Sequence, residues 1–228
     1  PEPFLPTGTV IAREQTYVYT FHKENAPKQA FADSEDNGRQ VIFSGADFKA
    51  TFDKQSGLLV SYQYKKQEFI HNGQGPRPFF FNVTRDKDTT AVKVTYRFPQ
   101  TDARWDITYK VYGNGVIKVD NRFVAENAQT PMIPRVGLRM QLPARITSLT
   151  YYGRGPEENY RDRRTSQFIG EYTSGIKDMY EPYVRPQENN HRTDIYWCTL
   201  TDKAQEGLLF VADRTFEMNV SNYPLESL

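Results

Sequence analysis

The sequence predicts an all-β protein built as a large antiparallel β-sandwich. Several runs alternate apolar and polar residues with a period of two, the pattern of strands that bury one face. Aromatic residues form 14% of the 228 residues, and Tyr and Phe favour strands and fill large cores. No window of about a dozen residues shows a helical period with capping residues, so we expect no long helix.

The first part of the chain is predicted to hold two short extended runs and a linker. The runs are Thr9–Ala12 and Gln15–Phe21, which follow a proline-rich start. The polar stretch Lys23–Arg39 contains Pro27 and Gly38, which interrupt regular elements, and it indicates a linker of low order.

A β-hairpin and a three-stranded meander follow. In the hairpin, Phe48–Phe52 and Leu58–Tyr64 alternate in polarity on either side of the turn residues Asp53–Gly57. The meander and the later strand candidates are Val92–Phe98, Trp105–Val111, Ile117–Phe123, Pro134–Leu142, Ser148–Tyr152, Ile195–Thr201, Gly207–Ala212 and Phe216–Val220. So many strands require two stacked sheets or a barrel, and we favour the sandwich.

Charge and composition argue against several classes of protein. The formal net charge of +1 provides no electrostatic footprint for nucleic acid or an anionic membrane. Cys198 is the only cysteine and the three histidines lack zinc-site spacing, so we expect no disulfide and no metal site. No apolar run approaches the roughly 18 residues that span a bilayer. Because the chain begins with Pro1, we expect it to be a piece of a longer protein.

The stretch YYGRGPEENYRDRR, Tyr151–Arg164, concentrates charged and aromatic residues. Gly153, Gly155 and Pro156 interrupt regular elements, so we expect a loop here. Loops held on a rigid scaffold often carry function, which makes this stretch the first candidate.

Four motifs resemble bacterial β-galactosidases of glycoside hydrolase family 2. Residues 152–163 resemble the family's GxGPxENYxDR segment, and Asp178–Val184 with Pro186–Asn189 resembles its MYxPYVxPxEN segment. Phe52–Leu59 and Thr9–Gln15 match two further segments in the family's order. The resemblance implies the C-terminal small-chain domain, a β-supersandwich akin to galactose mutarotase.

The resemblance also implies a domain arrangement. Residues 1–22 would be the closing strands of a preceding immunoglobulin-like domain or a linker, and residues 23–228 the supersandwich. The family's RAPTDND-like stretch is missing, so we expect a lost loop near residues 79–82, deleted from the chain or left out of the sequence. We also expect the domain to be incomplete at its C-terminus, because the family's SWxP-like loop and its sugar-contacting Trp are missing after Leu228.

The implied activity belongs to the parent enzyme, which would hydrolyse terminal β-D-galactosides with retention. Its two catalytic glutamates lie on a central barrel that nothing here resembles, so we expect the fragment to be inactive, with no catalytic residue and no cofactor of its own. The resemblance leaves open a divalent metal ion in the parent enzyme. The implied partners are the barrel and other domains of the parent chain, a galactoside and further copies in a homo-oligomer, without nucleic acid or membrane. The cellular location stays open between the bacterial cytoplasm and the periplasm.

Adjacent Glu157 and Glu158 are tempting as a catalytic pair, but neighbouring side chains in an extended segment point to opposite faces. We interpret the charges of this stretch, including those of Arg161 and Arg164, as paired with one another and fixing the loop. The predicted structural loop residues are Arg154, Glu157, Glu158, Asn159, Tyr160, Asp162 and Arg163.

Candidate carbohydrate-binding residues are Glu188, His191, Arg192 and Trp197. Trp197 and the nearby tyrosines provide faces on which a pyranose can stack, although aromatics serve core and inter-domain packing equally well. Two alternatives stay open. One is a standalone carbohydrate-binding or mutarotase-like domain, in which His191 and a glutamate would converge on one pocket. The other is a purely structural oligomerisation module.

Overall fold

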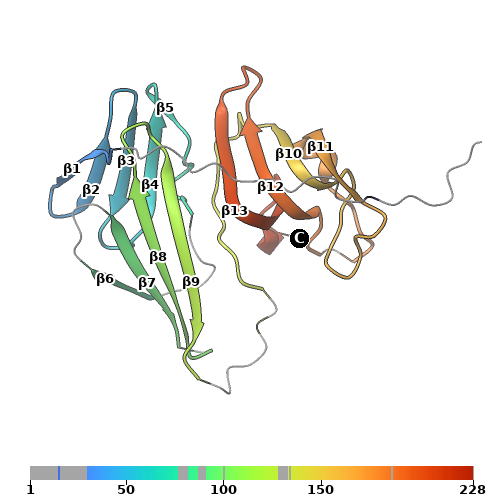
Figure 1. The fold of residues 1–228 in the computed structure, drawn as a ribbon, viewed down its shortest axis with the longest axis horizontal. Coiled ribbons are helices and arrows are strands. Elements are labelled where there is room, and N and C mark those ends of the chain that lie inside the picture. The colour runs from blue at the N-terminus through green and yellow to red at the C-terminus, as the bar shows by residue number, and fades with distance from the viewer. Residues whose placement is uncertain are drawn as a thin grey trace, which may run out of the picture. The chain divides into compact units, whose positions relative to one another are not determined.

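The computed structural model describes residues 15, 30–76, 82–86, 91–99, 101–127, 133, 135–185 and 187–227. These residues fall into two compact units, one within Ala26–Ala144 and the other within Arg145–Leu228 together with Gln15. Strands dominate both units, and the helical elements are two short 3-10 turns (Figure 1). In this described part no helix is long and apolar enough to cross a membrane. The prediction of an all-β antiparallel sandwich is confirmed.

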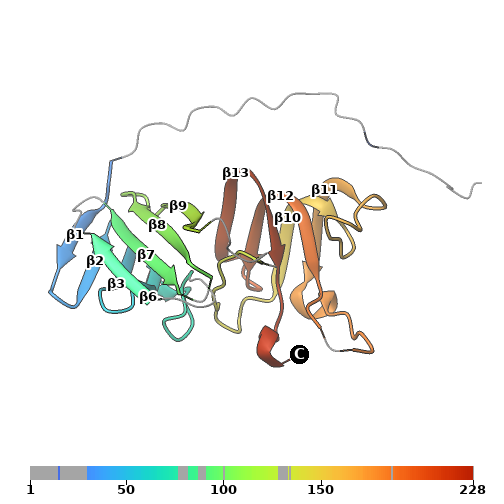
Figure 2. The same cartoon turned by 90° about the horizontal axis from the view of Figure 1, so that it is seen from below.

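The Ala26–Ala144 unit contains two antiparallel sheets, each a simple meander. The first sheet has the order β1-β2-β3-β4-β5, and its strands are β1 (Asp33–Asp36), β2 (Gln40–Ser44), β3 (Phe48–Asp53), β4 (Leu59–Tyr64) and β5 (Gln67–Glu68). The second sheet has the order β6-β7-β8-β9, and its strands are β6 (Asn82–Asp86), β7 (Val92–Phe98), β8 (Ala103–Val111) and β9 (Ile117–Ala125). Figures 1 and 2 show the two sheets stacked within this unit.

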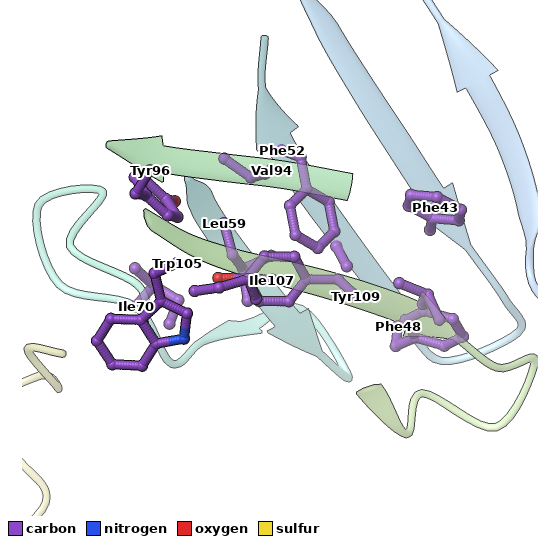
Figure 3. Packing of buried hydrophobic residues seen from close by; sticks show 12 residues of the cluster. Phe43, Phe48, Phe52, Leu59, Ile70, Val94, Tyr96, Trp105, Ile107 and Tyr109 are labelled. Atoms are coloured by element: carbon purple, nitrogen blue, oxygen red, sulfur yellow. The ribbon is translucent and has the colours of Figure 1, made fainter. Parts of the chain in front are cut away.

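The core of this unit lies between the two sheets. Strand β8 alternates buried and half-buried residues along its whole length, because its inward side chains, Trp105, Ile107 and Tyr109 among them, face the first sheet. Figure 3 shows Phe52 of β3 beside Tyr109, and their ring centroids lie 5.1 Å apart. Apolar side chains from both sheets therefore fill one core, as a sandwich requires.

Two predictions in this unit were wrong in part. The linker expected over Lys23–Arg39 contains strand β1, which pairs antiparallel with β2. All four β1 residues, Asp-Ser-Glu-Asp, are exposed, so this strand carries no apolar pattern that would reveal it. The strand expected over Pro134–Leu142 is also absent, since residues 135–142 contain only an isolated bridge at Arg139.

The Arg145–Leu228 unit contains one antiparallel sheet of order β11-β10-β12-β13. Its elements are β10 (Ser148–Gly155), β11 (Phe168–Gly175), η1 (Ile176–Met179), β12 (His191–Thr201), β13 (Gly207–Asn219) and η2 (Leu225–Ser227). Strand β13 is continuous where the sequence predicts two strands, and register shifts along β12 accommodate its length. Gln15 exchanges two hydrogen bonds of 2.7 Å with the backbone of Ile169 on β11.

The expectation that glycines end the strand and begin a loop at this point was wrong. Gly153 and Gly155 both lie within β10. At Gly153 the neighbouring strand approaches so closely that glycine is required. A Cβ atom on Gly153 would lie 2.5 Å from Cδ1 and 2.9 Å from Cα of Ile195 on β12. Glycine here permits strand packing rather than ending the strand.

The buried face of this sheet carries a cysteine. Cys198 of β12 lies opposite Tyr151 and Phe210 and is 3% exposed. Burial raises the pKa of the Cys198 thiol to about 12.

Several predictions fall outside the described residues. Two of them are the runs Thr9–Ala12 and Gln15–Phe21, of which the structure describes only Gln15. Phe79–Phe81, where the missing loop is expected, also lie outside the described residues.

Candidate functional site

A surface hollow of about 500 Å³ lies beside the segment that follows β10. We call it the Tyr160 hollow, and its lining residues are Glu158, Tyr160, Asp162, Arg163, Tyr183, Gln187 and Glu188. The lining comes from the two motifs that the sequence analysis singled out, residues 152–163 and 178–189. The fold thus brings both motifs to one site.

Glu158 joins the two motifs through its carboxylate. The Tyr183 hydroxyl donates to Oε1 of Glu158 at 2.5 Å, and the Arg163 guanidinium donates to the same oxygen. The backbone N–H of Asn190 donates to Oε2. The Glu158 side chain is only 14% exposed, so three donors stabilise a largely desolvated charge.

Asn159 fixes the same segment against β12 from a fully buried position. Its Oδ1 accepts hydrogen bonds from the backbone N–H and the hydroxyl of Thr193, at 3.0 and 2.6 Å. Its Nδ2 donates to the carbonyl oxygens of Arg154 and Glu157. The side chain thereby satisfies backbone groups that a non-repetitive segment would otherwise leave unpaired.

Tyr160 lies in the wall of the hollow and stacks on His191, with ring centroids 4.8 Å apart and planes inclined by 12°. The Arg163 guanidinium carbon lies 5.5 Å from the centroid of the tyrosine ring. Burial, together with the nearby negative charges of Glu158 and Glu188, raises the pKa of Tyr160 to about 12. The Tyr160 hydroxyl therefore stays protonated at neutral pH and donates to the Glu188 carbonyl oxygen at 3.4 Å.

His191 is held behind Tyr160 by both ring nitrogens. Nδ1 lies 2.7 Å from Oδ1 of Asn219, and Nε2 lies 3.1 Å from Oε2 of Glu217. Burial acts to raise the pKa of Glu217, but hydrogen bonds from Arg161 and His191 outweigh it and lower that pKa. Arg161 reaches Glu217 at 2.5 Å.

The expected pairing within the Tyr151–Arg164 stretch is confirmed for Glu158 with Arg163 and wrong for the other arginines. Arg154 and Arg164 both reach Asp194 of β12, at 2.6 and 3.1 Å. Asp194 has a left-handed backbone conformation, with φ of 55°, at the register shift of β12. Apart from the Glu158–Arg163 pair, the charges thus fix the stretch to the neighbouring strands β12 and β13.

The four predicted sugar-binding residues occupy different environments. Glu188 lines the hollow, and His191 supports Tyr160 from behind. Arg192 is 5% exposed, and its guanidinium donates to the Tyr151 hydroxyl at 3.2 Å, so it is a core residue. Trp197 lies in the middle of β12 opposite Tyr152, outside the lining of the hollow.

The sequence analysis considered Tyr183 only as one of several tyrosines on which a sugar could stack, and it missed two further contributors to this site. Asn190 lies next to the second motif, whose resemblance was the signal that could have identified it. Glu217 lies on β13, and no motif marks it. No group of three or more His, Cys, Asp or Glu side chains suited to a metal ion occurs among the residues that the structure describes. The hollow offers carboxylate, amide and phenol groups, which suit hydroxyl-rich ligands.

Comparison with known proteins identifies the family. A family model described as "Beta galactosidase small chain" matches residues 80–228, which is more than half of the chain. The chain belongs to this small-chain family. The resemblance to bacterial β-galactosidases drawn from the motifs is thereby confirmed.

Three relatives illustrate the match. The β-galactosidase of Vibrio cholerae is 35% identical over 268 residues, covering 97% of this chain and 25% of that protein. The β-galactosidase of Priestia megaterium is 31% identical over 221 residues, covering 83% of this chain and 21% of that protein. The β-galactosidase of Streptococcus thermophilus is 27% identical over 258 residues, covering 99% of this chain and 25% of that protein.

The small-chain region therefore spans about a quarter or less of these β-galactosidases. The match to the Streptococcus protein extends over 258 residues although this chain has 228, so the relative has residues without a counterpart here. This difference does not locate them, and the loop expected to be missing near residues 79–82 stays a prediction.

Proposed function

We propose that this small-chain region is the non-catalytic part of a β-galactosidase that hydrolyses terminal β-D-galactosides with retention. It shapes one wall of the parent enzyme's sugar site. It also supports assembly with the catalytic barrel and with further copies in a homo-oligomer. Membership in the small-chain family supports the proposal.

The main support for the non-catalytic role is that both carboxylate oxygens of Glu158 are already hydrogen-bonded within the protein. A retaining glycosidase needs two carboxyl groups about 5 Å apart, each free to reach the scissile bond. The two Glu158 oxygens accept hydrogen bonds from Arg163, Tyr183 and the Asn190 backbone. Its neighbour Glu157 does not line the hollow. The two adjacent glutamates are therefore structural in this proposal.

The sugar-contacting role falls to Glu188. Carboxylates accept hydrogen bonds from sugar hydroxyls, and Glu188 lines the hollow together with the Tyr160 and Tyr183 phenols. His191 acts as a positioning residue, because its ring stacks on Tyr160. Arg192 donates to the buried Tyr151 hydroxyl and is a core residue rather than a sugar contact in this proposal.

The mutarotase-like alternative receives less support from the geometry. A mutarotase needs a histidine that exchanges a proton with the sugar. Both ring nitrogens of His191 face side-chain oxygens, those of Asn219 and Glu217. Its stacked ring also lies behind Tyr160 rather than among the lining residues.

Turnover of a chromogenic β-galactoside tests the non-catalytic role. We expect the 228-residue chain alone to show no turnover, and the parent enzyme that contains it to be active. The parent enzyme with this region deleted should lose activity, and addition of the separate chain should restore part of it. Turnover by the chain alone would overturn the proposal.

Steady-state kinetics of the parent enzyme test the role of Glu188. Glu188→Gln should raise KM for the galactoside about tenfold with a smaller change in kcat, because it weakens a substrate contact rather than removing a catalytic group. Glu171→Gln, on the exposed part of edge strand β11, is the matched control and should leave both constants unchanged. An unchanged KM for Glu188→Gln would remove this residue from the sugar site.

A further inference from the structure

A second hollow, of about 380 Å³, lies in the Ala26–Ala144 unit beside the β2–β3 and β4–β5 turns. Its charged lining residues are Asp47, Lys49, Lys65 and Lys66, so ammonium groups outnumber carboxylates three to one. We call it the lysine hollow. It shares no residue with the Tyr160 hollow.

The three ammonium groups of the lysine hollow form no ion pair with the residues that the structure describes. Lys49, Lys65 and Lys66 are exposed, and the described residues provide no carboxylate within ion-pair distance of them. Elsewhere in this unit lysines do pair, as Lys54 with Asp36 at 2.7 Å and Lys118 with Asp120 at 3.2 Å. The hollow therefore concentrates positive charge that is available to a ligand.

The backbone under two of these lysines is strained. Tyr64 pairs with Gln67, so Lys65 and Lys66 form a two-residue turn, and their φ angles are 47° and 67°. Such turns need positive φ at both positions and strongly prefer Asn-Gly. Non-glycine residues in this region are destabilised, and such strain concentrates at functional positions.

Three turns of this unit place glycine at positive φ, whereas the β7–β8 turn places Asp102 there, with a φ of 47°. The three are the β1–β2, β3–β4 and β8–β9 turns, with Gly38, Gly57 and Gly115. The Lys65–Lys66 turn instead keeps two cations where small residues would relax the backbone. Its position is fixed, because the N–H of Lys65 donates to the Asp47 carbonyl oxygen of the β2–β3 turn at 2.6 Å.

We infer that the lysine hollow binds the sulfate or carboxylate groups of an acidic polysaccharide. Lysine ammonium groups only donate hydrogen bonds, so their ligand must be an acceptor, and a multivalent anion engages several of them at once. An exposed, open hollow suits groups that project from a polymer. The anion site is inferred from the lysine positions alone. The choice of a polysaccharide as the molecule that bears the anionic groups rests on the proposed function.

Calorimetric titration of the 228-residue chain with a sulfated galactan tests this inference. We expect binding that weakens as salt is added, and no comparable binding of an unsulfated galactan of equal length. The variant Lys65→Asn/Lys66→Gly should bind the sulfated galactan at least about tenfold more weakly, through the loss of two cations. Its Tm should rise, because Asn-Gly relaxes the turn.

The matched control is Lys110→Gln/Lys118→Gln, which removes two lysines of the same unit outside the hollow whose side chains are 40% and 47% exposed. It should bind the sulfated galactan like the wild type. The inference is overturned if the wild type does not bind this polymer, or if both variants weaken equally. Equal affinity for unsulfated galactan, duplex DNA or anionic lipid vesicles would also overturn it. None of these results depends on galactoside turnover, so the two proposals fail separately.

Discussion

Apolar burial stabilises the aromatic core of the Ala26–Ala144 unit, whereas hydrogen bonds and ion pairs stabilise the Tyr160 hollow of the Arg145–Leu228 unit. In the core, Phe52 and Tyr109 belong to a cluster of apolar side chains from two sheets. Apolar burial is non-directional and scales with area. At the hollow, Glu158 and Asn159 are held by donors and acceptors in fixed directions.

This difference determines what each region tolerates. A core of this kind accepts a change of shape better than a loss of volume. A buried polar network accepts neither partner's removal, because the remaining group stays desolvated without a hydrogen bond. Substitutions that remove one kind of force at a time test the comparison.

The largest effect is expected in the aromatic core. Phe52→Ala should lower the free energy of unfolding of its unit by roughly 3–5 kcal/mol, because it removes transfer energy and leaves a cavity. Urea denaturation followed by Trp105 fluorescence in a variant lacking Trp197 measures it. Val116→Ala, at a side chain that is 52% exposed, is the control and should change little. A loss below about 1 kcal/mol for Phe52→Ala would mean that the core is loosely packed.

The next effect is expected at Asn159. Asn159→Ala leaves the buried Thr193 hydroxyl and N–H without their acceptor, so we expect a loss of roughly 2–4 kcal/mol. Urea denaturation followed by Trp197 fluorescence in a variant lacking Trp105 isolates this unit. Asn222→Ala, at an exposed position near the end of the chain, is the control. Equal stability of both variants would show that water replaces the network.

A smaller effect is expected where β10 meets β12. Gly153→Ala places a Cβ atom 2.5 Å from Cδ1 of Ile195, which overpacks the sheet and should cost roughly 1–3 kcal/mol. Gly113→Ala is the control, since its Cβ would meet its nearest atom at an ordinary 3.6 Å. Thermal unfolding compares the two. A Tm for Gly153→Ala at or above that of the wild type would contradict the close approach.

The smallest effect concerns pH and the support of His191. Glu217 has a folded-state pKa below its ordinary value, so its contribution to stability is present above the unfolded pKa and is lost as pH falls through the folded pKa. Between about pH 6 and pH 3, the wild type should therefore lose slightly more stability than Glu217→Gln, by less than about 1 kcal/mol because the pair is partly exposed. Urea midpoints across this range measure it, with Glu171→Gln as control. A steeper loss in Glu217→Gln would reverse the sign and refute the pairing.

The aromatic core was the part most open to prediction from sequence. Strands β7, β8 and β9 alternate with a period of two and are joined by short turns, so polarity and turn residues were sufficient to predict them. Strand β1 escaped because all of its side chains are exposed and polar. For such an edge strand only the pairing with β2 defines the element.

The Tyr160 hollow was predictable in its segments and not in its contacts. The two motifs marked residues 152–163 and 178–189, but the partners of Arg154 and Arg161 lie 40 and 56 residues away. Adjacent opposite charges therefore suggested local pairs, whereas the strand order decides which carboxylate each arginine meets. Likewise Gly153 was predicted to interrupt the strand. The close approach of Ile195, which explains why glycine is needed within the strand, is visible only once β10 and β12 are side by side.

The position of Cys198 equips the molecule with a reporter for one unit only. As the single cysteine, its shielded thiol reacts with a thiol reagent only when the Arg145–Leu228 unit opens. The labelling rate at neutral pH thus reports the opening equilibrium of the unit that holds the Tyr160 hollow. Opening of the Ala26–Ala144 unit, which has no cysteine, does not contribute to this rate. Sugar added to the chain should slow this reaction if it binds there, without any assay of turnover.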